Sequence, residues 1–583
     1  MNTNIKGAYR RGVFMNQEVR ANTRFGEIYY QEELGHEYLM FGNRGLVAKM
    51  MNEEVDPRSD PLGPDNKLFI TTGIFAGTPV NTGHRLSFGG KSPLTGTIKE
   101  SNVGGNAAYH LAGHGIKLLV IEDTPKDDNW RIIKILQDGQ LEFADANEFV
   151  GLNTYEFTAK AQKEHGEEAA IISIGQAGER KYNLSAIMVT EDKTGYPCRA
   201  AARGGLAAVM ATKKIKGIVI EKPDKRVSPN YYDREQFVEA NKRFTRHLQC
   251  DDSWLTASLR DVGTIGNIDV TAATGILPVN NFRGDFFDKL NQLNSKAFLT
   301  KLEQNGGRNK IACQPGCAIR CSNEYRDEQG EIVTSSLEYE TISMLGPNCD
   351  IADYDFLAEI DRKCDDFGID TIEFGNTVAM CMEAGKIEWG DKDGVKALLE
   401  ELEKGTEFGK LLGRGTKAVG EEFAVKRIPT VKGQAMSAYD PRNLKGIGVT
   451  YAVTPMGADH TCGVTMMPGL DHMNKAGQVQ LSSKIQMVSA AADNCMCLFA
   501  FQSAILEGLL PDIFAGYFGG EWTTEEIIEL GAKTIAMEKE FNTQAGFSEK
   551  DDLLPEFFYH ERSQATGEVF DITAEELKKT FPF

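Results

Sequence analysis

The stretch Ala312-Cys-Gln-Pro-Gly-Cys-Ala-Ile-Arg-Cys-Ser-Asn323 places Cys313, Cys317 and Cys321 at C-x3-C-x3-C spacing. A Pro-Gly pair between the first two cysteines bends the segment, so the three thiols can converge on one metal centre. A cubane iron–sulfur cluster needs four thiolate ligands. The triplet therefore predicts an iron–sulfur cluster, and a fold that brings a fourth cysteine from elsewhere in the chain.

Other interpretations of the triplet fit its spacing less well. Structural zinc sites usually use close C-x2-C pairs, and the radical-SAM signature, C-x3-C-x2-C, differs by one residue. Chance core cysteines are not expected in a segment so polar and so bent. The cysteines that stand singly along the chain are interpreted as structural, because buried free thiols are common.

The composition predicts a large, acidic, globular protein. Its 583 residues are enough for several domains. The net charge of −20 argues against nucleic acid as a partner, because phosphate binding needs clustered lysine and arginine. Eleven irregularly spaced cysteines do not suggest a disulfide framework. The first residues are polar and no long apolar run follows, so we expect a cytoplasmic protein with reduced thiols and no membrane span.

The pattern of residue types changes twice along the chain. Short β-branched runs predict strands at 67–72, 116–122, 170–174 and 215–221, and three-to-four spacing predicts helices at 233–246, 286–304, 356–367 and 479–510. Proline and glycine residues between 427 and 446 suggest a second boundary. We therefore predict an α+β protein with a β-rich N-terminal domain (1–220) and two mainly helical domains (221–430 and 431–583).

Three clusters in the N-terminal domain suggest anion binding: 82–96, 100–105 and 199–210. Paired glycines let backbone amides approach phosphate oxygens, while arginine and lysine neutralise their charge. Gly204 and Gly205 precede a helix-favouring run, so a helix N-terminus can also face the anion. Neither a Walker A motif nor a Rossmann fingerprint is present. The clusters predict a large phosphorylated cofactor.

Several of these runs also carry a family resemblance. They are Gly-Asn-Arg-Gly-Leu (42–46), Asp-Pro-Leu-Gly-Pro-Asp-Asn (60–66), Lys-Ser-Pro-Leu-Thr-Gly (91–96), Ser-Asn-Val-Gly-Gly (101–105), Ile-Gly-Gln-Ala-Gly-Glu (174–179) and Arg-Gly-Gly-Leu-Ala-Ala-Val-Met (203–210). In this order, and continued through the cysteine triplet into the last third, they resemble the aldehyde:ferredoxin oxidoreductase family. Members of that family hold tungsten, less often molybdenum, between two pterin dithiolenes beside one [4Fe-4S] cluster. The resemblance implies that the N-terminal domain cradles this bis-pterin cofactor.

The resemblance also implies which residues bind the cofactor. The residues that match positions holding the pterin phosphates are Arg85, Asn102, Gly104, Gly105, Arg203 and Gly204. A Mg²⁺ ion would bridge the phosphates through the carbonyls of Asn102 and Gly204. The family's Asp-x-x-Gly-Leu pterin motif implies contacts from Asp365, Gly368, Ile369 and Asp370. An acidic side chain can accept hydrogen bonds from the NH groups of a reduced pterin.

The family takes its fourth cluster thiolate from far downstream, in a segment ending Gly-Leu-Cys. Aligning that ending with this chain selects Cys497 as the ligand and includes Asp493 and Met496 among the pterin contacts. The same alignment puts Ala492 where the family has its aspartate, one position before Asp493. Cys495 remains an alternative fourth ligand.

Two motifs imply acid–base groups beside the metal. The Glu-Tyr-Glu-Thr motif at 338–341 resembles one whose second glutamate faces the metal, which implies Glu340 as catalytic and Glu338 as an outer group. The segment 454–460 resembles the loop that carries the family's active-site histidine, here His460. Relatives usually have arginine where Met456 stands. A carboxylate can deprotonate water and an imidazole can polarise a carbonyl.

The resemblance implies a tungsten- or molybdenum-pterin oxidoreductase. We expect it to oxidise an aldehyde reversibly to a carboxylic acid and to pass electrons through the cluster to ferredoxin or a ferredoxin-like subunit, in a homo- or hetero-oligomer. Reduction of aromatic acyl-CoA thioesters and interconversion of 2-oxo and 2-hydroxy acids stay open as alternatives. So does a non-catalytic electron-transfer or scaffold subunit without the metal-pterin.

Overall fold

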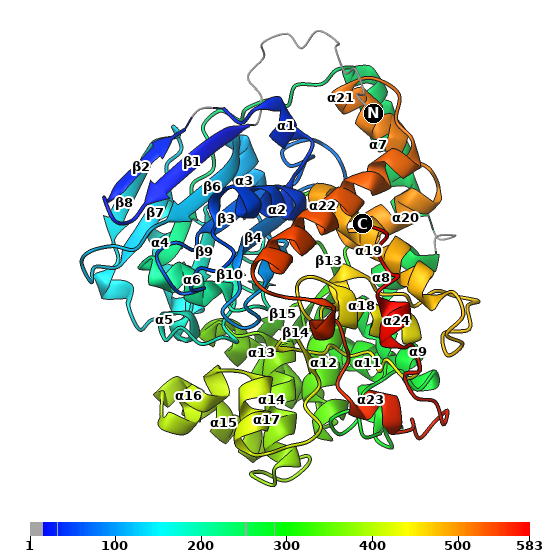
Figure 1. Ribbon diagram of the computed structural model, residues 1–583. Helices are drawn as coiled ribbons and strands as arrows, with labels where there is room; N and C mark the ends of the chain where they lie inside the picture. Colours follow the sequence, from blue (N-terminus) through cyan, green and yellow to red (C-terminus); the bar gives the residue numbers. More distant parts are fainter. Residues whose placement is uncertain (1–15, 32, 251–253, 285) are drawn as a thin grey trace.

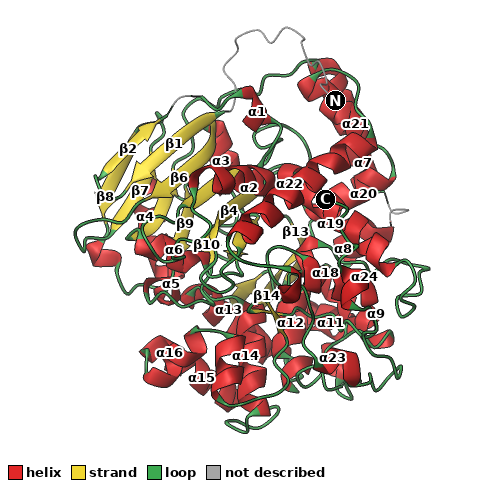
Figure 2. Ribbon diagram, viewed as in Figure 1, coloured by secondary structure: helices red, strands yellow, loops and turns green. Residues whose placement is uncertain are grey.

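The computed structural model describes residues 16–31, 33–250, 254–284 and 286–583. Strands gather in the N-terminal part, and helices make up most of the remainder (Figures 1 and 2). The predicted α+β fold class is confirmed. The strands belong mainly to two six-stranded mixed sheets.

The first sheet has the order β2-β1-β6-β3-β4-β5 and the second the order β11-β10-β9-β12-β7-β8. Their bounds are β1 Gln17–Asn22, β2 Glu27–Tyr30, β3 Leu68–Thr72, β4 Leu86–Lys91, β5 Ile98–Val103, β6 Ile116–Glu122, β7 Arg131–Ile135, β8 Leu141–Asp145, β9 Ala170–Ile174, β10 Ile187–Val189, β11 Arg199–Ala201 and β12 Ile215–Ile220. β1 runs parallel to β6 and β12 parallel to β7, whereas the other pairs are antiparallel. The four strands predicted from sequence are β3, β6, β9 and β12.

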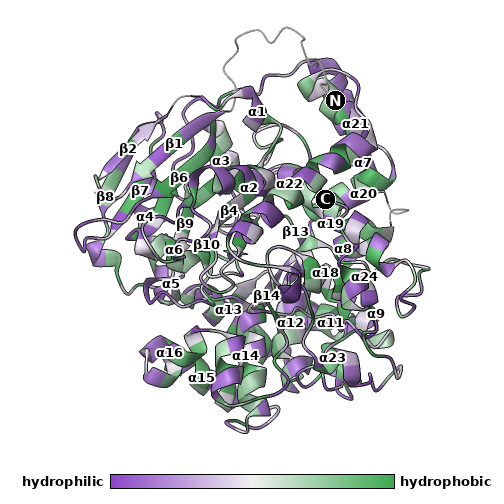
Figure 3. Ribbon diagram, viewed as in Figure 1, coloured by the Kyte–Doolittle hydropathy of each residue, from purple (hydrophilic) through white to green (hydrophobic). Residues whose placement is uncertain are grey.

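Burial explains why these short runs form strands. Every residue of β3, β9 and β12 is buried, which fits their continuous β-branched and apolar composition. The helices among the strands are α1 His36–Leu39, α2 Asn43–Glu54, α3 Ala107–Gly113, α4 Thr154–His165, α5 Gln176–Glu179 and α6 Leu206–Thr212. Figure 3 shows hydrophobic segments along the inner strands and mixed colouring on peripheral helices, as expected for elements with one buried side.

The rest of the chain is largely helical. Its helices are α7 Arg234–Gln249, α8 Trp254–Asp261, α9 Asn267–Ala273, α10 Leu290–Leu293, α11 Ser295–Asn305, α12 Tyr339–Leu345, α13 Tyr354–Phe367, α14 Thr371–Glu383, α15 Lys392–Lys404, α16 Glu407–Gly413, α17 Thr416–Glu422, α18 Lys445–Val453, α19 Gln478–Cys495, α20 Leu498–Leu506, α21 Leu510–Phe518, α22 Thr524–Gln544, α23 Phe557–His560 and α24 Ala574–Leu577. A small sheet joins β13 Arg308–Ile311, β14 Ser322–Arg326 and β15 Ile332–Ser335, and a second joins β16 Thr430–Val431 and β17 Gln434–Ala435.

Two predicted helices are interrupted. The segment 286–304 divides at Asn294, whose side chain accepts a hydrogen bond from the Ala297 amide at 2.8 Å and so starts α11. The segment 479–510 divides at Met496 and Cys497 between α19 and α20, and α20 ends at Leu506, before α21 begins at Leu510. The predicted helices at 233–246 and 356–367 are observed, with slightly different ends, as α7 and α13.

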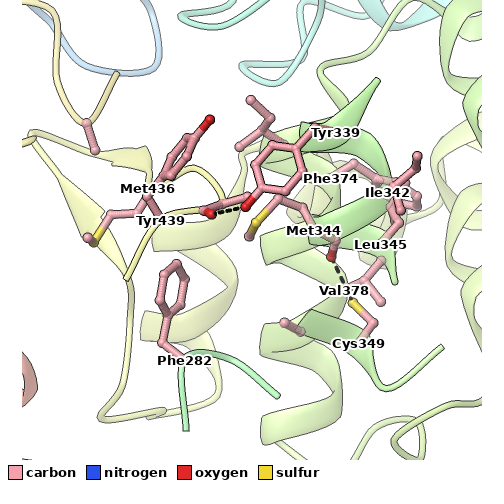
Figure 4. Close-up of a cluster of buried hydrophobic side chains, with 14 of the residues drawn as sticks. Phe282, Tyr339, Ile342, Met344, Leu345, Cys349, Phe374, Val378, Met436 and Tyr439 are labelled. Atoms are coloured by element: carbon pink, nitrogen blue, oxygen red, sulfur yellow. Dashed lines mark hydrogen bonds between the residues drawn. The ribbon is translucent and has the colours of Figure 1, made fainter. Parts of the chain in front are cut away.

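A buried apolar core organises the helices around α12 (Figure 4). Tyr339 packs into this core, and its hydroxyl donates a hydrogen bond to the Ala438 carbonyl at 2.7 Å. The next residue, Glu340, is half-buried at the edge of the core. The core includes residues on both sides of position 430, such as Met380 and Tyr451, and the boundaries at 220 and 430 stay predictions.

Among the described helices, none by itself has the length and apolarity needed to cross a membrane; α19 and α20 together reach them, as a pair bent by 119°.

Candidate active site and metal centre

The loops that carry the predicted cluster cysteines meet at one backbone carbonyl. The triplet lies in the loop between β13 and β14, and Cys497 lies in the turn between α19 and α20. The Cys497 amide donates to the Thr82 carbonyl at 3.1 Å. The side-chain amide of Gln314 donates to the same carbonyl at 3.3 Å. Two segments far apart in sequence are thereby held side by side.

The four thiols are also close enough to affect one another's ionisation. A hydrogen bond with Cys317 lowers the pKa of Cys313, and the positive charges of Arg199 and Arg85 lower it further. Burial raises the pKa of Cys497, and the charge of Cys313 adds to that effect. Thiols in this situation favour a bound cation that shares their negative charge. The donor set fits a four-thiolate iron–sulfur cluster.

Cys495 has different surroundings. It is fully buried, and burial raises the pKa of its thiol well above the ordinary value. Its charged neighbours are Lys117 and Asp493, not the triplet. This supports Cys497 as the fourth ligand, which stays a prediction. Within the described ranges, no three His, Cys, Asp or Glu side chains surround the position of a single metal ion.

The predicted phosphate-binding residues of the first sheet adjoin the triplet. Arg85 donates through Nε to Oδ1 of Asn102 at 2.5 Å. The Gly105 amide donates to the Cys313 carbonyl at 2.7 Å. A Cβ atom on Gly104 would lie 3.2 Å from Nη1 of Arg85 and 3.0 Å from the Cys313 carbonyl oxygen, closer than side chains usually approach. Glycine at 104 thus allows the sheet edge and the cysteine loop to touch.

Arg203 faces Asp370, so residues of two predicted pterin motifs lie together. Their Nε and Oδ2 atoms are 3.4 Å apart. Both side chains are buried, yet Nε and Nη1 of Arg203 and Oδ2 of Asp370 make no hydrogen bond to any described residue. Such buried polar atoms usually have partners. Their arrangement fits a bound polar group that supplies them, with Arg203 as the anion contact.

The neighbouring predicted residues shape this region through the backbone. Asp370 starts α14 by accepting from the Ile372 amide at 2.9 Å, while Gly368 ends α13 with φ of +79°. Ile369 pairs with Ser185 of the N-terminal part. The Gly204 carbonyl, predicted to hold Mg²⁺, accepts a hydrogen bond from Oγ of Ser92 at 2.7 Å. Magnesium at this position stays a prediction.

The carboxyl of Asp365 lies on α13 among other acids. Burial raises its pKa above the ordinary value, and the nearby Asp361 raises it further. A protonated carboxyl can donate as well as accept hydrogen bonds. Asp365 is therefore chemically suited to the NH and carbonyl groups of a pterin ring.

Asp493 and Met496 lie at the end of α19. Oδ2 of Asp493 is 3.3 Å from Nη1 of Arg44, and Arg44 also binds both carboxyl oxygens of Glu538, at 2.8 and 2.9 Å. Met496 is buried in an apolar cluster that also contains Cys317. A buried arginine between two acids holds Asp493 in one orientation, a contact that the sequence did not reveal.

The side chains of the two predicted catalytic residues, Glu340 and His460, lie close together. Nε2 of His460 is 3.3 Å from Oε1 of Glu340, and the Ala438 amide donates to Oε2 of Glu340 at 2.9 Å. His460 begins a short 3-10 helix, His460–Cys462, whose preceding residue is Asp459. Asp459 binds the buried Lys99 at 2.5 Å, which ties the histidine loop to β5.

A cavity of about 870 Å³ opens beside this pair. Glu340, His460 and Tyr439 lie in its wall, together with Glu338. Burial raises the pKa of Tyr439 well above its ordinary value, and the charge of Glu340 raises it further, so the phenol stays a hydrogen-bond donor. An acid, a histidine and a phenol around one cavity can orient a carbonyl compound and exchange protons with it.

Comparison with known proteins shows the family of the chain. Residues 22–222 match the N-terminal domain of aldehyde ferredoxin oxidoreductase, and residues 239–581 match its domains 2 and 3. The chain belongs to the aldehyde ferredoxin oxidoreductase family. It is similar to the tungsten-containing aldehyde ferredoxin oxidoreductase of Pyrococcus furiosus, with 31% identity over 93% of this chain and 91% of that protein. The enzyme of the same description from Thermococcus kodakarensis gives the same figures.

A solved structure shares the fold. It is the active site complex BamBC of benzoyl coenzyme A reductase with 1,5 dienoyl-CoA, with a TM-score of 0.80, 17% identity, and coverage of 97% of this chain and 93% of that one. As a member of the aldehyde ferredoxin oxidoreductase family, the chain is an oxidoreductase enzyme.

Several site residues in this family member were not identified from sequence. Arg199 lies in the glycine-rich cluster 199–210, and no motif assigns it to the cysteines, yet it lies beside Cys313 and donates to Oγ of Ser322 at 2.8 Å. Tyr439 and Lys99 had no motif of their own. Each acts through a partner distant in sequence, so spacing along the chain carries no signal for them.

Proposed function

We propose that the chain oxidises aldehydes reversibly to carboxylic acids, with a tungsten- or molybdenum-bis-pterin cofactor, one [4Fe-4S] cluster and ferredoxin or a ferredoxin-like subunit as electron acceptor. The names of the relatives from Pyrococcus and Thermococcus, which specify tungsten and ferredoxin, support this proposal. The observation that carries it is the Glu340–His460 pair in the wall of the large cavity.

The residues present fit such a cofactor. The phosphates would be held by the donor atoms of Arg203 that lack a hydrogen bond, by the Arg85–Asn102 pair and by the glycines at 104 and 105. Asp365, Asp370 and Asp493 would contact the pterin rings, and the four thiols would hold the cluster. When bound, the metal-pterin supplies the two-electron oxidising centre and the cluster supplies a one-electron outlet.

The side chains of this chain handle the substrate and its protons. Oxidation of an aldehyde consumes one water and releases a carboxylate, two electrons and three protons. Glu340, held through Oε2 by the Ala438 amide, leaves Oε1 to orient the water and accept a proton. His460 and the phenol of Tyr439 can polarise the carbonyl oxygen. Nε2 of His460 lies 3.3 Å from Oε1 of Glu340, so the two groups can act on the same substrate.

The cluster loop gives electrons a way out of the molecule. Cys313, Cys321 and Cys497 are half-buried, and Gly316 and Arg320 of the same loop are exposed. A ferredoxin or ferredoxin-like subunit that docks here would approach the cluster closely.

The test is elemental analysis of anaerobically purified protein, combined with aldehyde-dependent dye reduction. We expect about one tungsten or molybdenum and about four iron atoms per chain, and stoichiometric formation of the carboxylic acid. Metal-replete protein that oxidises none of a broad aldehyde panel would overturn the proposal. Iron without tungsten or molybdenum in protein made with both metals supplied would overturn the cofactor assignment.

A further inference from the structure

The cavity beside Glu340 and His460 is larger than a small aldehyde needs. Its volume of about 870 Å³ is near the top of the roughly 300–1,000 Å³ range of pockets that enclose drug-sized ligands. Helices α8, α19, α20 and α22 all contribute apolar side chains to its wall. Leu259, Val488, Leu498 and Phe499 are among them. Most of this wall offers no hydrogen bond to a ligand.

The apolar lining continues to the molecular surface. Val270, Leu470 and Leu506 line the cavity and are also 47%, 46% and 60% exposed. They come from α9, the loop before α19 and the end of α20. Large exposed apolar side chains in the wall of one cavity mark a site for an apolar ligand. An apolar path therefore runs from the acid–histidine pair to solvent.

Charge in the cavity does not suit an anionic substrate. Glu338 and Glu340 lie in the wall, whereas Lys484 is the single lysine or arginine among the described lining residues. Lys484 is exposed on α19. A phosphate or a sulfonate needs more than one cation or several amide donors in a desolvated site. The wall instead favours an uncharged chain.

From this geometry we infer that the substrate is a straight-chain aliphatic aldehyde of medium to long chain length. Its carbonyl lies at Glu340 and His460, and its alkyl chain follows α20 to the rim formed by Val270, Leu470 and Leu506. This inference rests on the proposed aldehyde oxidation and specifies its substrate class. Moving each methylene from water to the apolar wall should raise the binding constant about fourfold.

The first test is a series of straight-chain aldehydes from two to twelve carbons, oxidised by the metal-replete holoenzyme. We expect kcat/KM to rise by about two- to fourfold per methylene over several carbons and then to level off when the chain passes the rim. A flat or falling series overturns the inference. So does a preference for benzaldehyde or for a phosphorylated aldehyde over decanal.

A rim variant tests where the chain lies. Leu506→Glu puts a charge on an exposed position and should lower the ratio of kcat/KM for decanal to that for propanal at least fivefold. Val150→Glu is the matched control, because Val150 is 41% exposed on the N-terminal part and does not line the cavity. An unchanged ratio in Leu506→Glu overturns the placement of the chain.

A binding measurement keeps the test independent of turnover. Titration calorimetry of the holoenzyme with 1-butanol and 1-decanol should give a Kd at least 100-fold lower for 1-decanol. Equal affinities overturn the inference. Failure of the proposed function is distinguishable, because then no aldehyde of any length is oxidised, whereas failure of this inference leaves short aldehydes as good substrates.

Discussion

At the scale of single residues, Thr82 links the cluster loops to the first sheet. Its carbonyl accepts from the Cys497 amide and from the Gln314 side chain. Its φ is +60°, a conformation that β-branched residues rarely adopt. Such strain persists where surrounding contacts demand it, commonly at functional sites. The contacts that demand it here are those that hold Cys497 beside the triplet.

The first prediction concerns the fourth cluster ligand. Cys497→Ser should lose most of the cluster, because three thiolates and a weak hydroxyl ligand hold iron poorly. Iron content and visible absorbance after anaerobic purification measure this. Cys495→Ser is the matched control, since Cys495 lies two residues away, is buried and has Lys117 as its neighbour. Cluster loss in Cys495→Ser with retention in Cys497→Ser would reverse the assignment.

Sequence motifs identified residues that lie within a recognisable family run, such as Glu340 in 338–341 and His460 in 454–460. They did not locate Lys99, and they placed Arg44 in the run 42–46 without showing its acidic partners, although each is buried against an acid near the site. An ion pair between segments hundreds of residues apart leaves no spacing pattern. Burial of a charge is itself visible only in the fold, because lysine and arginine are ordinarily surface residues.

At the scale of elements, the break between α19 and α20 places Cys497 in a turn instead of inside a helix. Periodicity predicted one helical segment through 479–510 because the apolar spacing continues across the break. Met496 instead adopts an extended conformation with φ of −163°, and Cys497 starts the next helix. No proline or glycine marks this turn, so tertiary contacts to Thr82 and Ile74 decide it.

The second prediction tests how α22 supports this turn. A Cβ atom on Gly531 would lie 1.9 Å from the Met487 carbonyl oxygen on α19, so Gly531→Ala forces the two helices apart. We expect a loss of roughly 1–3 kcal/mol in the free energy of unfolding and a lower iron content. Glu529→Ala, on the exposed side of α22, should have little effect on either. Equal stability of both variants would contradict this packing.

The third prediction concerns a lysine that follows α6. Lys213 is fully buried, its Nζ lies 3.2 Å from the Pro64 carbonyl, and burial lowers its pKa from 10.5 to about 8. Between these pH values the unfolded chain binds more protons than the folded chain, so stability rises with pH. The total gain is roughly 3 kcal/mol.

Lys213→Met removes the titrating group. We therefore expect the stability of the unmodified protein, measured by urea unfolding relative to this variant, to increase between pH 8 and pH 10.5. Parallel stability profiles for the two proteins across that range would show that the buried amine does not titrate as described.

At the scale of the whole molecule, the site lies where the N-terminal sheets meet the helical part. Arg203 belongs to the first part and Asp370 to the second, and their side chains face each other. The fold class was predictable because strand and helix periodicities occupy separate regions of the chain. The meeting of these regions was not, because it depends on contacts such as Ile369 with Ser185 that no local pattern encodes.

The fourth prediction separates the two cofactor sites. Arg203→Met should lose tungsten and pterin while keeping about four iron atoms per chain. Arg203 is assigned to the pterin phosphates and not to the cluster, and the cluster loop is held separately by the Thr82 carbonyl. Metal analysis and pterin fluorescence after acid release provide the readout. Arg203→Lys keeps the charge beside Asp370 and should keep part of the cofactor. Full tungsten occupancy in Arg203→Met would contradict the phosphate-binding role.

The catalytic role of Glu340 is tested most directly by the kcat/KM of Glu340→Gln for aldehyde oxidation, measured on protein with unchanged tungsten or molybdenum and iron content. Glutamine keeps the size of the side chain and its place beside His460 but cannot accept the proton. We predict a fall in kcat/KM of at least 100-fold. A value within a few-fold of the unmodified enzyme would contradict the role of Glu340 in the reaction.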